Sequence, residues 1–125
     1  MNLSCDGVQI TINLPNGIYM LQKEGGIGKT FLATLLGKLG ECGESLASVT
    51  YCNGERVTKG NLQTARIIMY DRVDRYVSKS LADEMESLSC KSIILMAYNG
   101  YYKDFNVYRK RAYISYDGKD IKVTL

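Results

Sequence analysis

The stretch Ile18-Tyr19-Met20-Leu21, followed three residues later by Gly25-Gly26-Ile27-Gly28-Lys29-Thr30, is the part of this chain that favours one fold over others. An apolar strand, a glycine-rich turn and a helix-patterned run over 31–39 follow one another, which is the context of a phosphate-binding loop. Glycines let the backbone curl so that successive N–H groups point at one anion, and a helix N-terminus adds unpaired donors. The predicted phosphate-binding residues are Gly25, Gly26, Ile27, Gly28, Lys29 and Thr30.

Two side chains of this motif have distinct predicted roles. Lys29 is expected to reach the β- and γ-phosphates of a nucleotide, and the Thr30 hydroxyl is expected to hold Mg²⁺. The expected cofactors are therefore ATP (or GTP) and Mg²⁺. The motif departs from its usual form at Lys23, which stands where the first glycine of the pattern is expected. The alternative is a surface turn that happens to contain Gly-Lys-Thr.

A second metal-binding group is predicted at Asp71, which ends the apolar strand 65–71. An acid at the end of such a strand orients the Mg²⁺ shell across from the phosphate-binding loop, so Thr30 and Asp71 form the predicted metal pair. The alternatives are a helix cap or an ion pair with a nearby arginine.

Hydrolysis also needs a group that orients the attacking water, and the residue after Asp71 is Arg72 rather than an acid. Asp74 is the nearest carboxylate that could act in its place, and it is the predicted catalytic residue. Asp74 could equally cap the helix expected over 75–88.

The hydrophobic pattern predicts strands at 8–14, 18–21, 46–51, 65–71 and 91–97, and helices at 29–39 and 75–88. The first two strands are expected to form a hairpin around Pro15-Asn16-Gly17, and 107–125 a hairpin around Asp117-Gly118. Residues 55–63 are polar and are predicted to be a loop. The predicted fold class is therefore α/β, a P-loop NTPase-like three-layer fold with a mainly parallel central sheet, helices packed on it and antiparallel hairpins at both ends.

Length and composition are ordinary for a single globular domain spanning residues 1–125. The 125 residues are 46% hydrophobic and 23% charged, and the net charge is +3. No apolar run approaches the ~20 residues that span a bilayer, and no signal peptide is visible, so a cytoplasmic protein without a membrane span is expected. The chain has no histidine and four scattered cysteines, which argues against a zinc site and against Ser-His or Cys-His catalysis.

The order of these motifs resembles the ATPase domain of ABC-type proteins, including the RecF/SMC-like branch. The loop Gly25-Gly26-Ile27-Gly28-Lys29-Thr30 looks like the family's Walker A motif, and Ile67-Ile68-Met69-Tyr70-Asp71 looks like its Walker B motif. Ile93-Ile94-Leu95-Met96 is similar to the strand before the family's switch histidine. The resemblance implies binding of ATP and Mg²⁺ by the residues named above.

The chain also departs from that family. No room exists between Tyr51 and Ala65 for the helical subdomain with its signature motif, and Tyr98 or Asn99 stands at the switch-histidine position. Gln63 is the only glutamine near a Q-loop position. The expected protein is a minimal, degenerate relative whose nucleotide hydrolysis is weak or depends on a partner, acting as an accessory or switch.

Two other functions remain open. A truncated domain of this kind could be a non-catalytic interaction module that modulates a host ATPase, as a mobile-element or phage protein would. Its partner surface is expected in the C-terminal region, where tyrosines precede Arg109-Lys110-Arg111. The same aromatic and basic residues could instead bind nucleic acid by stacking and phosphate contacts. The aromatic residues concerned are Tyr98, Tyr101, Tyr102, Phe105 and Tyr108.

Overall fold

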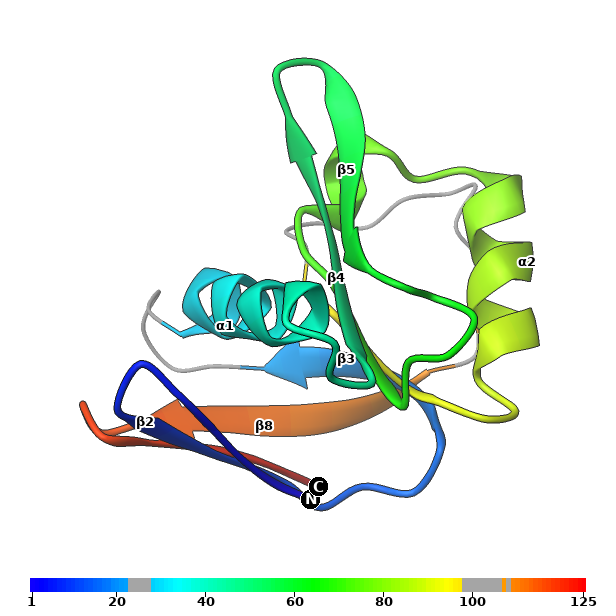
Figure 1. The fold of residues 1–125 in the computed structure, drawn as a ribbon. Coiled ribbons are helices and arrows are strands. Elements are labelled where there is room, and N and C mark those ends of the chain that lie inside the picture. Colours follow the sequence, from blue (N-terminus) through cyan, green and yellow to red (C-terminus); the bar gives the residue numbers. More distant parts are fainter. Residues whose placement is uncertain (23–27, 98–106, 108) are drawn as a thin grey trace.

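The computed structural model describes residues 1–22, 28–97, 107 and 109–125, which form nine strands, two α-helices and one 3₁₀ helix (Figure 1). The helices are α1 (Lys29–Glu41), η1 (Val73–Arg75) and α2 (Lys79–Leu88). The strands are β1 (Asn2–Cys5), β2 (Val8–Ile12), β3 (Gly17–Gln22), β4 (Leu46–Cys52), β5 (Glu55–Gly60), β6 (Ile67–Tyr70), β7 (Ile93–Met96), β8 (Lys110–Tyr116) and β9 (Asp120–Thr124).

All nine strands belong to one sheet, in the order β1-β2-β9-β8-β3-β7-β6-β4-β5. The five strands from β8 to β4 run parallel to one another, and β2 is also parallel to β9. The pairs β1–β2, β8–β9 and β4–β5 are antiparallel. The sheet is therefore mixed, with a parallel centre and antiparallel pairs toward both edges.

The two α-helices lie on opposite faces of the central strands. Alternate residues of a strand point to opposite faces, and β6 shows this clearly. Ile67 and Met69 belong to the core that includes α1, whereas Ile68 and Tyr70 belong to the core that includes α2. Both cores are thus built on the same strands, which explains why β6 and β7 are apolar at every position.

The expected three-layer P-loop NTPase-like fold is wrong. The described residues form one curled, mixed nine-stranded sheet with only two α-helices, rather than a mainly parallel sheet covered by helix layers. The sheet bends so that α1 lies in its concave face, where β2, β8 and β9 pack with it into one core (Figure 1). The physical reason is composition: helix-patterned sequence occupies only two short segments, and the remaining apolar segments pair with one another as strands.

The hairpin expected around Pro15-Asn16-Gly17 is also wrong. β2 pairs with β1 and β9, and β3 pairs with β7 and β8, so the two strands are not neighbours. β2 instead forms a hairpin with β1 through Asp6 and Gly7, both of which have positive φ. Gly suits such a conformation, and Asp tolerates it better than most residues.

Other local predictions are confirmed within a few residues. Strands form at β2, β3, β4, β6 and β7, a helix forms at α1, and β8 and β9 form the hairpin around Asp117-Gly118. The segment predicted as a polar loop contains β5, which pairs with β4 across the Asn53-Gly54 turn. The second helix begins later than expected, at Lys79, because Ser78 caps it by accepting a hydrogen bond from the Leu81 N–H at 3.1 Å. Within the described part of the chain, no helix is long and apolar enough to cross a membrane.

The last turn of α1 packs directly on the backbone of β4 and β5. A Cβ at Gly40 would overlap the carbonyl oxygen of Leu46 and would meet the Cα of Gly60 at 3.2 Å. Neither neighbour is a flexible side chain, so a Gly40→Ala substitution is expected to lower the free energy of unfolding by roughly 2 kcal/mol. Urea denaturation would measure this loss.

Gly37→Ala is the matched control in the same helix. Its Cβ would meet the Lys59 side chain at 3.2 Å, and that side chain can move. The better helix propensity of alanine should then leave the stability unchanged or raise it by up to about 1 kcal/mol. If the two variants had equal free energies of unfolding, the close contact at Gly40 would not be the reason that alanine is unfavourable there.

Candidate functional site

The carboxyl ends of the parallel strands meet at one edge of the sheet, where open parallel sheets bind ligands. The chain leaves β6 toward β7, by way of α2, and leaves β4 toward β5 in the opposite direction. Because β6 and β4 are neighbours, the two connections diverge at this edge. Such a divergence is the position at which a crevice for a ligand is expected.

Several predicted site residues, after β3 and shortly after β7, lie outside the described residues. They include Gly25, Gly26 and Ile27 of the predicted phosphate-binding loop, and Lys23 before it. Tyr98 and Asn99, at the expected switch-histidine position, and Tyr101, Tyr102, Phe105 and Tyr108 of the aromatic cluster also lie outside them.

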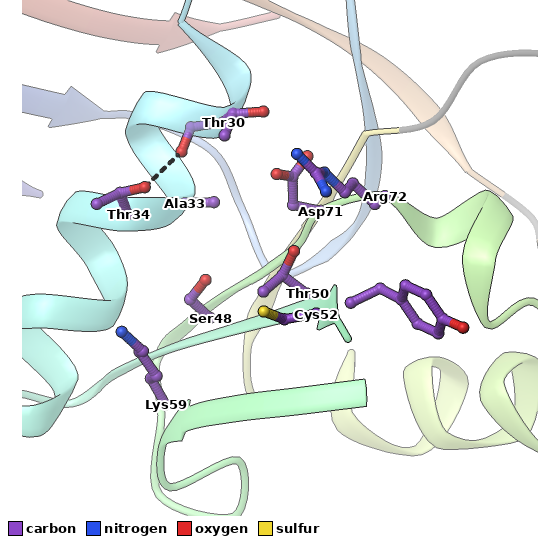
Figure 2. A pocket seen from close by; sticks show the side chains of 10 residues that line it. Thr30, Ala33, Thr34, Ser48, Thr50, Cys52, Lys59, Asp71 and Arg72 are labelled. Atoms are coloured by element: carbon purple, nitrogen blue, oxygen red, sulfur yellow. Dashed lines mark hydrogen bonds between the residues drawn. The ribbon is translucent and has the colours of Figure 1, made fainter. Parts of the chain in front are cut away.

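A hollow of about 230 Å³ lies near this edge, between the first turns of α1, the β4–β5 hairpin and the end of β6 (Figure 2). Its polar groups are hydroxyls, one thiol, one carboxylate and two cations. It is lined by Thr30, Ala33, Thr34, Ser48, Thr50, Tyr51, Cys52, Lys59, Asp71 and Arg72.

The hollow brings together the two residues predicted to bind a metal. Thr30 lies in the first turn of α1, and Asp71 lies directly after β6, 41 positions later in the chain. The residue Asp71 is only 4% exposed, and no hydrogen bond or ion pair of its carboxylate is found among the described residues. No fully buried side-chain oxygen in this part of the chain lacks a hydrogen-bond partner, so the carboxylate oxygens of Asp71 reach the hollow, where a ligand can contact them. The ion pair with arginine that could have explained Asp71 is not formed in this part of the chain.

The backbone around Asp71 is held from several sides. Its N–H donates to the Val49 carbonyl at 2.8 Å, and its carbonyl accepts from the Tyr76 hydroxyl at 2.5 Å. Two residues later, the Val73 N–H donates to the Ala97 carbonyl at 3.2 Å. These bonds tie the end of β6 to its neighbours and fix the direction in which the Asp71 side chain leaves the backbone.

Arg72 adopts a left-handed backbone conformation in this turn, with φ 54° and ψ 44°. For a residue with a Cβ, this conformation costs about 1–2 kcal/mol, and it persists only where the surroundings enforce it. The hydrogen bonds on both sides of Arg72 supply that enforcement. Strain of this kind gathers at functional sites.

Tyr76 and Tyr70 brace the same turn from the face of the sheet that carries α2. Burial raises the pKa of both phenols far above the ordinary value, so both keep their protons. Tyr70 donates to Glu84 at 2.7 Å, and Arg56 of β5 binds the same carboxylate at 3.0 and 2.7 Å. The tyrosines therefore connect β5, β6 and α2 as hydrogen-bond donors rather than as acids or bases.

Among the described residues, no side chain caps the first turn of α1. Gly28 is the residue before the helix, with φ 130°, and it has no side chain to accept from the helix N–H groups. The first turn also contains no acidic residue, so nothing on the helix itself opposes a negative charge there. Lys29 is the first residue of α1 and is half-buried, but it is not part of the lining of the hollow.

Asp74 lies apart from the hollow. It is on η1, and its carboxylate lies 3.8 Å from the Nε of Arg75. Its alternative role as the cap of the second helix is wrong, because Ser78 caps α2. The catalytic role of Asp74 stays a prediction from the sequence.

Sequence reasoning missed the lining contributed by β4 and β5, namely Ser48, Thr50, Cys52 and Lys59, and it missed Arg72 as a lining residue. The signal that could have found the first four is Asn53-Gly54, a strong hairpin dipeptide. It pairs β5 with β4 and so places Lys59 opposite Ser48. Nothing in the sequence marks the left-handed conformation of Arg72.

No group of three or more His, Cys, Asp or Glu side chains that could hold a metal is found in the described residues. One carboxylate and one hydroxyl, from Asp71 and Thr30, are too few to hold Mg²⁺ alone. Mg²⁺ commonly binds through one or two carboxylates together with phosphate oxygens and waters. The donor set thus fits a metal that arrives with a phosphorylated ligand.

Comparison of the chain with protein-family models, with curated proteins and with solved structures finds no match.

Proposed function

We propose that this protein binds a nucleoside triphosphate, ATP in the first place, together with Mg²⁺, at the edge formed by α1 and the ends of β3 and β6. The observation that supports this proposal is that Thr30 and Asp71 line one polar hollow, where the Asp71 carboxylate has no partner among the described residues. These two residues were expected to act together from the sequence motif alone, and 40 residues separate them in the chain.

Each group has a role in this proposal. The uncapped N–H groups at the start of α1 and the Lys29 ammonium bind phosphate oxygens. Thr30 and Asp71 hold Mg²⁺, which neutralises phosphate charge when it is bound. The low exposure of Asp71 would strengthen its attraction to the metal, because fewer waters would screen the two charges.

Fast hydrolysis is not part of the proposal. A water-orienting carboxylate is absent directly after Asp71, where Arg72 stands, and Asp74 lies outside the lining of the hollow. The protein is thus best suited to hold the nucleotide, with turnover that is weak or depends on groups supplied by a partner. Such a protein acts as an accessory or switch.

Calorimetric titration of ATP into the purified protein, with Mg²⁺ and then with EDTA, tests the proposal. A Kd of roughly 1–100 µM is expected with Mg²⁺, or about 5.5–8 kcal/mol of binding free energy. Binding should be at least tenfold weaker in EDTA, because Asp71 then faces the phosphates without a metal. The absence of binding, or the same affinity in both buffers, would contradict the proposal.

A further inference from the structure

Arg72 carries a cation without a partner at the hollow. It lines the hollow with Asp71 (Figure 2), and within the described residues its guanidinium makes no hydrogen bond or ion pair. The only hydrogen bond of Arg72 in this part of the chain is accepted by its backbone carbonyl, from the Arg75 N–H at 2.9 Å. The Asp71 carboxylate beside it is likewise unpartnered, so the two side chains stay separate although they are neighbours.

The other cation of the hollow has an acidic neighbour, although both side chains are about half exposed. Lys59 lies 3.9 Å from the Glu41 carboxylate, at the far end of α1 from Thr30. Arg72 therefore supplies the positive charge of the hollow that is available to a ligand, and it does so next to the predicted metal ligand.

The backbone conformation of Arg72 adds a second, independent observation. Glycine or asparagine is the residue that normally occupies a left-handed position. A long cationic side chain there is strained, and bonds to Val49, Tyr76 and Ala97 hold the turn in place. This arrangement fixes the direction in which the Arg72 side chain leaves the backbone, as it does for Asp71.

We propose that Arg72 contacts the terminal phosphate of a bound nucleoside triphosphate and makes the site selective for triphosphate over diphosphate. This inference rests on the proposed function. A metal held by Thr30 and Asp71 would act on the outer phosphates, as Lys29 would, so a group beside Asp71 would lie near the terminal phosphate. A guanidinium matches phosphate oxygens in a two-pronged hydrogen bond, which makes arginine well suited to this contact.

The test compares Mg²⁺-ATP and Mg²⁺-ADP binding to the wild type, Arg72→Asn and Arg72→Lys by calorimetry. Asparagine tolerates the left-handed conformation, so Arg72→Asn removes the charge and leaves the turn. Arg75→Asn is the matched control, because Arg75 lies three residues later with a side chain 66% exposed and does not line the hollow. Thermal unfolding of each variant confirms that the fold is kept.

The wild type is expected to bind ATP at least tenfold more tightly than ADP. Arg72→Asn should lower the affinity for ATP about tenfold, which corresponds to the loss of one charge-assisted hydrogen bond, and should change that for ADP less than twofold. The ATP affinity of Arg72→Lys should lie between those of the wild type and Arg72→Asn. Both affinities of Arg75→Asn should match the wild type. Equal losses for ATP and ADP, or no loss, would overturn the role of Arg72 while leaving nucleotide binding in place. If the wild type bound neither nucleotide, the proposed function itself would fail, and this inference with it.

Discussion

Replacing Lys29 with alanine is expected to lower the affinity for Mg²⁺-ATP by at least a hundredfold while the fold survives. Lys29 begins α1 directly after Gly28, at the uncapped end of the helix. No ion pair or hydrogen bond of its ammonium is found in the described residues, so its removal leaves no protein group without a partner. Each hydrogen bond between charged groups contributes about 1.5–3 kcal/mol, and Lys29 is predicted to contact two phosphates.

Calorimetric titration measures this loss, with Lys79→Ala as the matched control. Lys79 is likewise the first residue of a helix, α2, and is exposed. Both substitutions make the same change in helix propensity and in net charge, so both should have thermal unfolding midpoints close to that of the wild type. Nucleotide affinity that is unchanged in Lys29→Ala, or reduced equally by Lys79→Ala, would show that the start of α1 is not the phosphate site.

The elements that the sequence predicts well are those with local signals. The apolar spacing in α1 and the continuous apolar runs in β6 and β7 give their type directly. β5 was missed because it is an edge strand. Five of its six residues are exposed, so it has no alternation of buried and exposed positions for a pattern to detect.

Strand pairing was harder to predict than strand existence. The alternation over 8–14 identifies β2 as a half-buried strand, but it carries no information about its neighbours. β2 pairs in parallel with β9, which lies more than 100 residues later, and this pairing closes the curled sheet around α1. Local turn signals such as Pro15-Asn16-Gly17 favour a hairpin between successive strands, and here the chain passes to the middle of the sheet instead.

In the candidate site, too, features with local sequence signals were predicted and features that depend on distant contacts were not. The Thr30–Asp71 pair could be predicted, because a strand, a turn and a helix start are each local and the parallel sheet brings their ends together. The wall of the hollow that β4 and β5 form depends on the pairing of these two strands, and the residues of β5 were predicted to be a loop. The conformation of Arg72 depends on bonds from Tyr76 and to Ala97, which only the folded chain assembles.

Replacing Asp71 with asparagine is expected to abolish ligand binding without lowering stability. The residue is 4% exposed, but its carboxylate faces the hollow and makes no hydrogen bond or ion pair in the described residues. Asparagine has nearly the same shape without the charge, so the variant loses no protein contact. In EDTA its free energy of unfolding, measured by urea denaturation, should stay within about 0.5 kcal/mol of the wild type.

The same variant should lose the stabilisation that ligand gives. A ligand that binds only the folded state at a hundred times its Kd adds about 2.7 kcal/mol, so Mg²⁺-ATP should raise the urea midpoint of the wild type clearly. Asp71→Asn should show little or no such rise, whereas Asp83→Asn, an exposed carboxylate on α2, should respond as the wild type does. A residue whose side chain serves a ligand rather than the fold produces this pair of results. If Asp71→Asn were instead less stable than the wild type in EDTA, the carboxylate would be a structural partner, and the case for a metal at this position would fall.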